Sequence, residues 1–150
     1  MHYLFWFFHI LGLAVWFGSL LFMGICLPLL KRGGLGKEIR HLLNQIRRVM
    51  TLVGNIAAAV MLVSGGLLLG TQPSGHGSSL WVQLMTQIGG ATILFSIIAL
   101  TWQGRNVANR LANEGATDTQ VQASTNVYQV FLWVIVAAIV VVLGIVSARV

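Results

Sequence analysis

Charge is scarce in this chain, and acidic charge is almost missing. Only 8% of the 150 residues are charged, and Asp and Glu together number 3. A soluble globular domain carries about 25% charged residues, so the composition argues against an ordinary soluble domain. The single cysteine, Cys26, excludes a framework of internal disulfides and is expected to be a small packing residue.

The few acidic residues lie outside the long apolar segments. They are Glu38, Glu114 and Asp118. A membrane proton relay and paired acid–base catalysis both need carboxylates within the apolar region, so neither function is expected. The sequence also has no phosphate-binding loop, nucleophile elbow or Cys-x-x-Cys pair. Whether the protein is an enzyme stays open at this stage.

Apolar residues make up 57% of the chain and are concentrated in four long blocks. The blocks are residues 3–30, 50–70, 80–103 and 126–148. A helix of roughly 20 apolar residues crosses a hydrocarbon core of about 30 Å, and short connections favour antiparallel neighbours. The sequence therefore predicts an all-α integral membrane protein, a single transmembrane domain folded in the lipid bilayer as an antiparallel four-helix transmembrane bundle.

The basic residues indicate the orientation of this bundle. Eight of the nine Lys and Arg residues lie in the connections that follow the first and third blocks; the exception is Arg149. By the positive-inside rule these connections face the cytoplasm, which places both termini outside, N-out and C-out. Topology and contact with anionic headgroups explain the net charge of +6, and we expect no binding to nucleic acid.

Shorter patterns add local predictions. Apolar residues at helical spacing in residues 37–48 predict a separate amphipathic helix in the membrane interface, and the third helix is expected to continue past Arg110. Small residues predict close helix packing: Gly12, Ser64, Gly65, Gly66, Gly70, Gly89, Gly90 and Gly144. Aromatic residues near the ends of the blocks predict membrane-interface belts: Tyr3, Trp6, Trp81, Trp102, Tyr128 and Trp133.

His9 is the one histidine within a block long enough to cross a bilayer. An ionisable residue inside a membrane is costly and is by default a candidate functional residue. At about 1.5 Å per residue, His9 lies about 10 Å from the outer end of its helix, Met61 about 13 Å and Gln87 about 10 Å, with Met85 slightly shallower. The sequence thus predicts that these residues form one layer in the outer leaflet.

This layer has three possible uses. Imidazole and thioether groups on neighbouring helices hold haem iron in many proteins, which makes His9, Met61 and Gln87 candidate residues of a haem b site. The same ligand types suit copper, and a copper site would draw on His2, His9, His76 and Met85. The third interpretation has no ligand: His9 is hydrogen-bonded to a backbone carbonyl or to Gln87 across the bundle.

The first block contains His9-Ile-Leu-Gly-Leu-Ala-Val-Trp16-Phe-Gly18 and then Leu27-Pro28, and a basic connection follows it; Ser64-Gly65 lies near the end of the second block. These motifs resemble a group of small membrane proteins that includes the copper-resistance protein D (CopD) domain and the HemJ type of protoporphyrinogen oxidase. The resemblance covers mainly the first 70 residues. It implies a four-helix protein linked to haem or copper, in a bacterial-type inner membrane, with His9 as axial haem ligand.

Two departures from this group concern the later helices. The third block lacks the lysine and histidine often found there, and the fourth ends without the usual Lys-Pro, so HemJ-type catalysis is not expected. The sequence predicts a haem b protein that serves electron transfer, or a respiratory or haem-handling complex, as a homo-oligomer or accessory subunit. The alternatives are a copper-handling membrane protein and a structural subunit without catalytic function.

Overall fold

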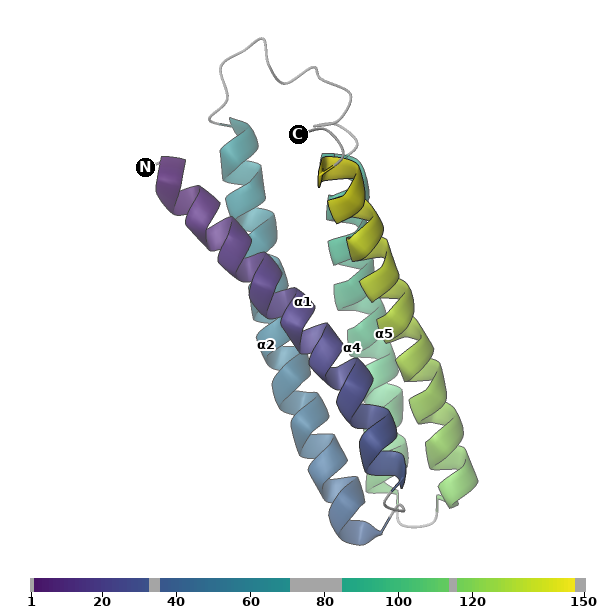
Figure 1. Cartoon of the computed structure of the whole chain (residues 1–150). Helices are drawn as coiled ribbons and strands as arrows, with labels where there is room; N and C mark the ends of the chain where they lie inside the picture. The colour runs from purple at the N-terminus through teal and green to yellow at the C-terminus, as the bar shows by residue number, and fades with distance from the viewer. Residues whose placement is uncertain (1, 33–35, 71–84, 114–115, 148–150) are drawn as a thin grey trace.

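The computed structural model describes residues 2–32, 36–70, 85–113 and 116–147. Four long helices run antiparallel (Figure 1): α1 (His2–Arg32), α2 (Lys37–Gly70), α4 (Gly90–Ala112) and α5 (Asp118–Ser147). A single π-helical turn, η1 (Met85–Gly89), leads directly into α4. The start of α1 and the end of α5 lie at the same end of the molecule (Figure 1). The predicted antiparallel four-helix bundle is confirmed.

Three of the described helices are long and apolar enough to cross a membrane: Tyr3–Leu30 in α1, Lys37–Gly70 in α2 and Asp118–Ile145 in α5. The helix α4 does not qualify, although the sequence predicts a span over residues 80–103. Its apolar stretch gives way to Gln103 and Arg105, and residues 80–84 lie outside the described part of the chain. The chain is a multi-pass helical membrane protein by the length and composition of its helices.

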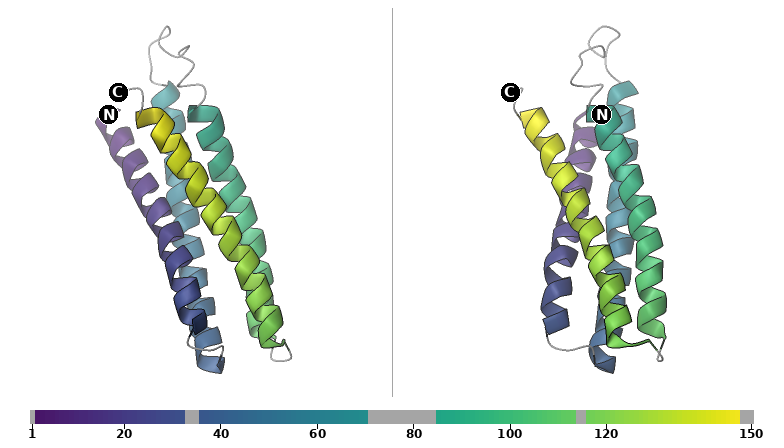
Figure 2. Two further views of the ribbon diagram at one scale, coloured as in Figure 1. Left: turned by 45° about the vertical axis from the view of Figure 1, so that its right-hand side comes forward. Right: turned by 90° about the vertical axis from the view of Figure 1, so that its right-hand side faces the viewer.

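The helices form a ring in the order α1, α2, α4, α5. The helix α1 packs against α2 and α5, and α4 packs against the same two neighbours. The contact between α1 and α2 is the most extensive. Near the termini α1 leans away from α5 (Figure 1), and in the right-hand view of Figure 2 the ribbon of α5 crosses in front of that of α1. The N-terminal half of α1 therefore has α2 as its main neighbour.

Large apolar side chains fill the centre of the bundle and also cover its outside. Trp16 is 3% exposed and Leu132 is 1% exposed, whereas Val63 is 64% exposed and Ile98 is 69% exposed. Apolar cover of this extent is unusual for a protein surrounded by water. It fits a helical bundle whose outer faces contact lipid, because each helix satisfies its own backbone hydrogen bonds there.

Two predictions about individual segments need correction. Residues 37–48 are not a separate interfacial helix, because α2 runs unbroken from Lys37 to Gly70. Leu43 is buried in the core and Ile39 and Ile46 pack against it, so most of the apolar stripe of this segment faces other helices, whereas Leu42 is exposed. Tyr128 is not part of an interfacial belt, because it is 2% exposed in the core.

The small residues divide into two groups. Gly12 and Gly65 lie in close contact with a neighbouring helix, as predicted. Among the described residues, no atom lies within 4 Å of the position that a Cβ would occupy at Gly66, Gly70, Gly89, Gly90 or Gly144. The predicted close packing is therefore not found at these five positions within the described part of the chain.

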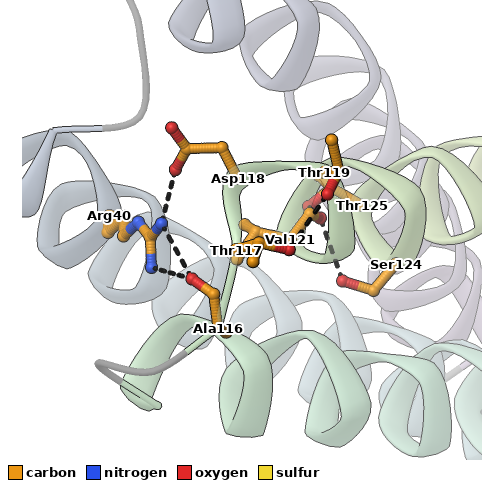
Figure 3. Close-up of polar contacts among 8 residues, drawn as sticks. All are labelled: Arg40, Ala116, Thr117, Asp118, Thr119, Val121, Ser124 and Thr125. Carbon is orange, nitrogen blue, oxygen red and sulfur yellow. Dashed lines mark hydrogen bonds and ion pairs between the residues drawn. The ribbon is translucent and has the colours of Figure 1, made fainter.

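At the basic end of the bundle, one side chain of α2 contacts the segment that leads into α5. Arg40 donates hydrogen bonds to the backbone carbonyl of Ala116 at 3.3 and 3.4 Å and pairs with the carboxylate of Asp118 at 2.5 Å (Figure 3). The prediction that the third helix continues past Arg110 is confirmed, since α4 ends at Ala112. Arg40 thus ties α2 to the start of α5 at this end.

Candidate functional site

His9 faces α2 from the third turn of α1 and is half-buried. Its Nδ1 lies 3.0 Å from the backbone carbonyl oxygen of Met61 and 3.3 Å from Oγ of Ser64. Both partners belong to α2. One of the interpretations of the sequence was a histidine hydrogen-bonded to a backbone carbonyl, and this contact is present.

The chemistry of the two partners determines where the imidazole proton lies. A backbone carbonyl only accepts hydrogen bonds, so Nδ1 of His9 must carry a hydrogen. The Ser64 hydroxyl donates its own hydrogen to the carbonyl of Val60 at 2.7 Å, so its oxygen is a second acceptor for Nδ1. A neutral imidazole protonated at Nδ1 keeps its lone pair on Nε2. The free ligand position of His9 is therefore Nε2.

Gly65 makes room for the imidazole ring. A Cβ at this position would lie 3.0 Å from Cε1 and 3.3 Å from Nδ1 of His9. These distances are shorter than ordinary van der Waals contact between carbon or nitrogen atoms, which is about 3.5–4.0 Å. The dipeptide Ser64-Gly65 thus supplies both a hydrogen-bond acceptor and the space for the histidine.

Gly12, one turn further along α1, brings the two helix backbones into contact. A Cβ on Gly12 would lie 3.0 Å from the carbonyl oxygen of Ala57 and 3.2 Å from Cβ of Met61. Close approach of this kind is the reason that small residues are enriched where membrane helices cross. His9 is therefore held next to the tightest part of the α1–α2 contact.

The Met61 side chain leaves α2 beside Gly12 and is half-buried against the core. Because α1 and α2 touch here, a macrocycle does not fit between His9 and Met61. An arrangement with these two residues on opposite faces of one haem is not compatible with this helix contact. The role that the structure gives to Met61 belongs to its backbone carbonyl.

Among the other residues predicted for this layer, Gln87 does not join the site. Gln87 lies in η1 with an exposed side chain, and η1 packs against α4 and α5. Backbone positions are described for His2 at the start of α1 and for Met85 in η1, without their side chains. His76 lies outside the described residues. No cluster of three or more His, Cys, Asp and Glu side chains occurs among the described residues.

Two residues of this site were missed as functional residues. Ser64 and Gly65 are recognisable in the sequence as small residues, but their spacing alone predicts only helix packing. The depth of His9 in the membrane is the signal that could have identified them, because His9 lies at the level of the helical turn that follows Met61.

No family model, curated protein or solved structure matches this chain.

Proposed function

We propose that this multi-pass membrane protein binds haem b through Nε2 of His9 and serves electron transfer as a subunit of a larger membrane assembly. The supporting observation is the hydrogen bond from Nδ1 of His9 to the carbonyl of Met61. Histidines that ligate metals commonly donate their other ring N–H to a carbonyl or carboxylate, which orients the ring and raises its basicity. Haem b, when bound, supplies one-electron chemistry at its iron.

The residues around His9 have separate tasks in this proposal. The carbonyl of Met61 and the oxygen of Ser64 accept the Nδ1 proton and orient the ring, and Gly65 leaves space for it. His9 is the ligand that this chain contributes, and Met61 acts through its backbone. Exposed apolar side chains on the same half of α1, among them Trp6, Phe7 and Phe8, offer the surface that a porphyrin or a partner helix requires.

An absorbance spectrum of the protein purified from haem-supplied cells tests this proposal directly. We expect a Soret band and bound iron in the wild type, both lost in His9→Ala. The matched control is His41→Ala, because His41 is exposed on α2 and lies away from the site. A colourless, iron-free wild-type protein would refute the proposal.

The variant Met61→Leu separates the two possible contributions of Met61. It removes the thioether and keeps the backbone carbonyl, so we expect the Soret band to stay with an unchanged reduced spectrum. A large fall in reduction potential would show that the thioether is an iron ligand, because a thioether ligand raises the potential.

Copper handling is the second candidate function. It is favoured by the close approach of α1 and α2 beside His9 and Met61, because a single ion needs far less space than a macrocycle. Imidazole and thioether are ligands suited to Cu(I). Copper retained after dialysis by the colourless wild type, and lost in both His9→Ala and Met61→Leu, would support this function over haem binding.

A further inference from the structure

Arg47 places a guanidinium group inside the bundle, at the end opposite to His9. Its side chain is half-buried, and Nη1 lies 2.9 Å from the position that a Cβ on Gly104 of α4 would occupy. Its Nη2 donates to Oδ1 of Asn44 at 3.0 Å. Its Nε is buried and has no hydrogen-bond partner among the described residues. The described residues thus leave at least this one of the five N–H donors of the guanidinium without an acceptor.

The described acidic residues do not neutralise this charge. Glu38 is exposed in the first turn of α2, and Asp118 pairs with Arg40. The electrostatic neighbours of Arg47 are the Tyr128 phenol on α5 and a second cation, Arg48. A partly buried cation without a counter-charge is costly, and in a membrane protein it marks a candidate binding site.

The surroundings of Arg47 are polar on all three neighbouring elements. Thr51, one turn further along α2, has a buried hydroxyl, and the Tyr128 ring of α5 lies 3.9 Å from the position that a Cβ on Gly104 would occupy. Asn55 donates to Thr101 of α4 at 3.2 Å one turn beyond that. Because Gly104 has no side chain, Nη1 of the guanidinium can approach α4 closely at this position. Among the described residues, these neighbours of the guanidinium are polar but uncharged.

The depth of Arg47 matches that of lipid phosphates. Counted from Gly70 at about 1.5 Å per residue, Arg47 lies about 35 Å along α2. The hydrocarbon core is about 30 Å thick, and the headgroup regions bring the bilayer to about 40–45 Å. The guanidinium is therefore at the headgroup level of the leaflet at the basic end, where Arg48 and Arg105 are also exposed.

We propose that Arg47 binds the phosphate group of an anionic phospholipid, which enters between α2 and α4 from the leaflet at the basic end. Arginine presents parallel N–H donors that match the oxygens of a phosphate, and basic pockets between transmembrane helices bind anionic headgroups. The lipid phosphate supplies the negative charge that the described residues do not place beside Arg47, and it is held by the outer N–H groups of the half-buried guanidinium. This site is separate from the proposed haem site and does not depend on it.

Native mass spectrometry of the delipidated full-length protein tests the site. Phosphatidylglycerol and phosphatidylcholine are added in equal amounts in a neutral detergent, and retained lipid is counted. We expect a preference for phosphatidylglycerol that falls about tenfold in Arg47→Gln, the loss of one charge-assisted contact. The matched control Arg48→Gln removes the same charge from an exposed neighbour and should change retention less than about twofold.

A second variant keeps every charge. Gly104→Ala places a Cβ 2.9 Å from Nη1 of Arg47, so it should displace the guanidinium and lower phosphatidylglycerol retention even if Arg47→Gln does not fold. Equal losses in Arg47→Gln and Arg48→Gln would overturn the proposal in favour of general surface attraction. Competition by millimolar inorganic phosphate that removes the lipid preference would overturn the assignment to a lipid, since the site would then take a free anion.

Discussion

Nδ1 of His9 donates a hydrogen bond to the backbone carbonyl of Met61 across the contact between α1 and α2. The bond joins two of the residues that the sequence assigned to one layer, but in a different way from the expected one. It uses the methionine backbone instead of its sulfur, and it directs Nε2 of the histidine away from the acceptor. The contact therefore leaves Nε2 of His9 as the free ligand position. It also argues against the Met61 sulfur as a second ligand that faces His9.

Replacing Gly65 by Ala should disturb His9. The new Cβ would lie 3.0 Å from Cε1 of the ring, so the imidazole must move away from its acceptors. We expect a loss of about 1–3 kcal/mol in the free energy of unfolding, measured by denaturation in mixed micelles, together with a weaker Soret band. The control is Gly66→Ala, where nothing lies within 4 Å and a small gain of helix stability is expected. Equal behaviour of the two variants would contradict the close packing of His9 on Gly65.

Gly12 is the second position where an added methyl group should be costly. Its Cβ would meet the carbonyl oxygen of Ala57 at 3.0 Å, and a backbone atom cannot rotate away as a side chain can. We expect Gly12→Ala to lower the unfolding free energy by about 1–3 kcal/mol. Gly18→Ala, on an open part of the same helix, should not lower it. A stable Gly12→Ala protein would show that α1 and α2 do not approach so closely.

Arg40 and Asp118 should make unequal contributions to stability. Asp118 is 69% exposed and Arg40 is 16% exposed, so the ion pair alone is worth no more than about 1 kcal/mol and weakens with salt. Arg40→Ala also removes the donors to the Ala116 carbonyl and should cost about 1–2 kcal/mol more than Asp118→Asn. Melting temperatures at low and high salt test this order. Equal losses in both variants would assign the whole effect to the ion pair.

Core and lipid-facing positions on α5 should respond differently to truncation. Leu132 is 1% exposed, so Leu132→Ala should cost about 2–5 kcal/mol through a cavity and lost contacts. Val130 is 61% exposed on the same helix, and Val130→Ala should have little effect because lipid fills the space. Chemical denaturation in micelles compares the two. A larger loss at Val130 would mean that this face packs against another protein chain.

Much of the architecture was predictable because it depends on composition and length. Long apolar blocks separated by short polar connections specify helices of membrane-spanning length, and they led to the correct four-helix arrangement. The boundaries were less predictable. Residues 37–48 carry an apolar stripe that suits a membrane surface and a bundle core equally, and the core is their actual environment. The same ambiguity led to the wrong prediction for Tyr128, because an aromatic residue near the end of a block can face either lipid or the interior.

The candidate site was predictable only at its centre. His9 stands out in the sequence because an ionisable residue in an apolar block is rare, and helix depth correctly paired it with the region of Met61. The roles of Ser64, Gly65 and Arg47 depend on the rotation of each helix about its axis and on the residue that faces it. Rotation is decided by contacts between helices, so no single segment contains that information.

Sequence alone determined that this chain is a helical membrane protein with a histidine in its first long apolar block, because hydropathy and helix length act within each segment. Tertiary structure alone decided that His9 donates to the Met61 carbonyl, that Gly12 and Gly65 permit this approach, and that Arg47 points into the bundle. The physical reason is that hydrogen bonds and close packing between helices depend on atoms far apart in the chain, and only the folded bundle brings those atoms within contact distance.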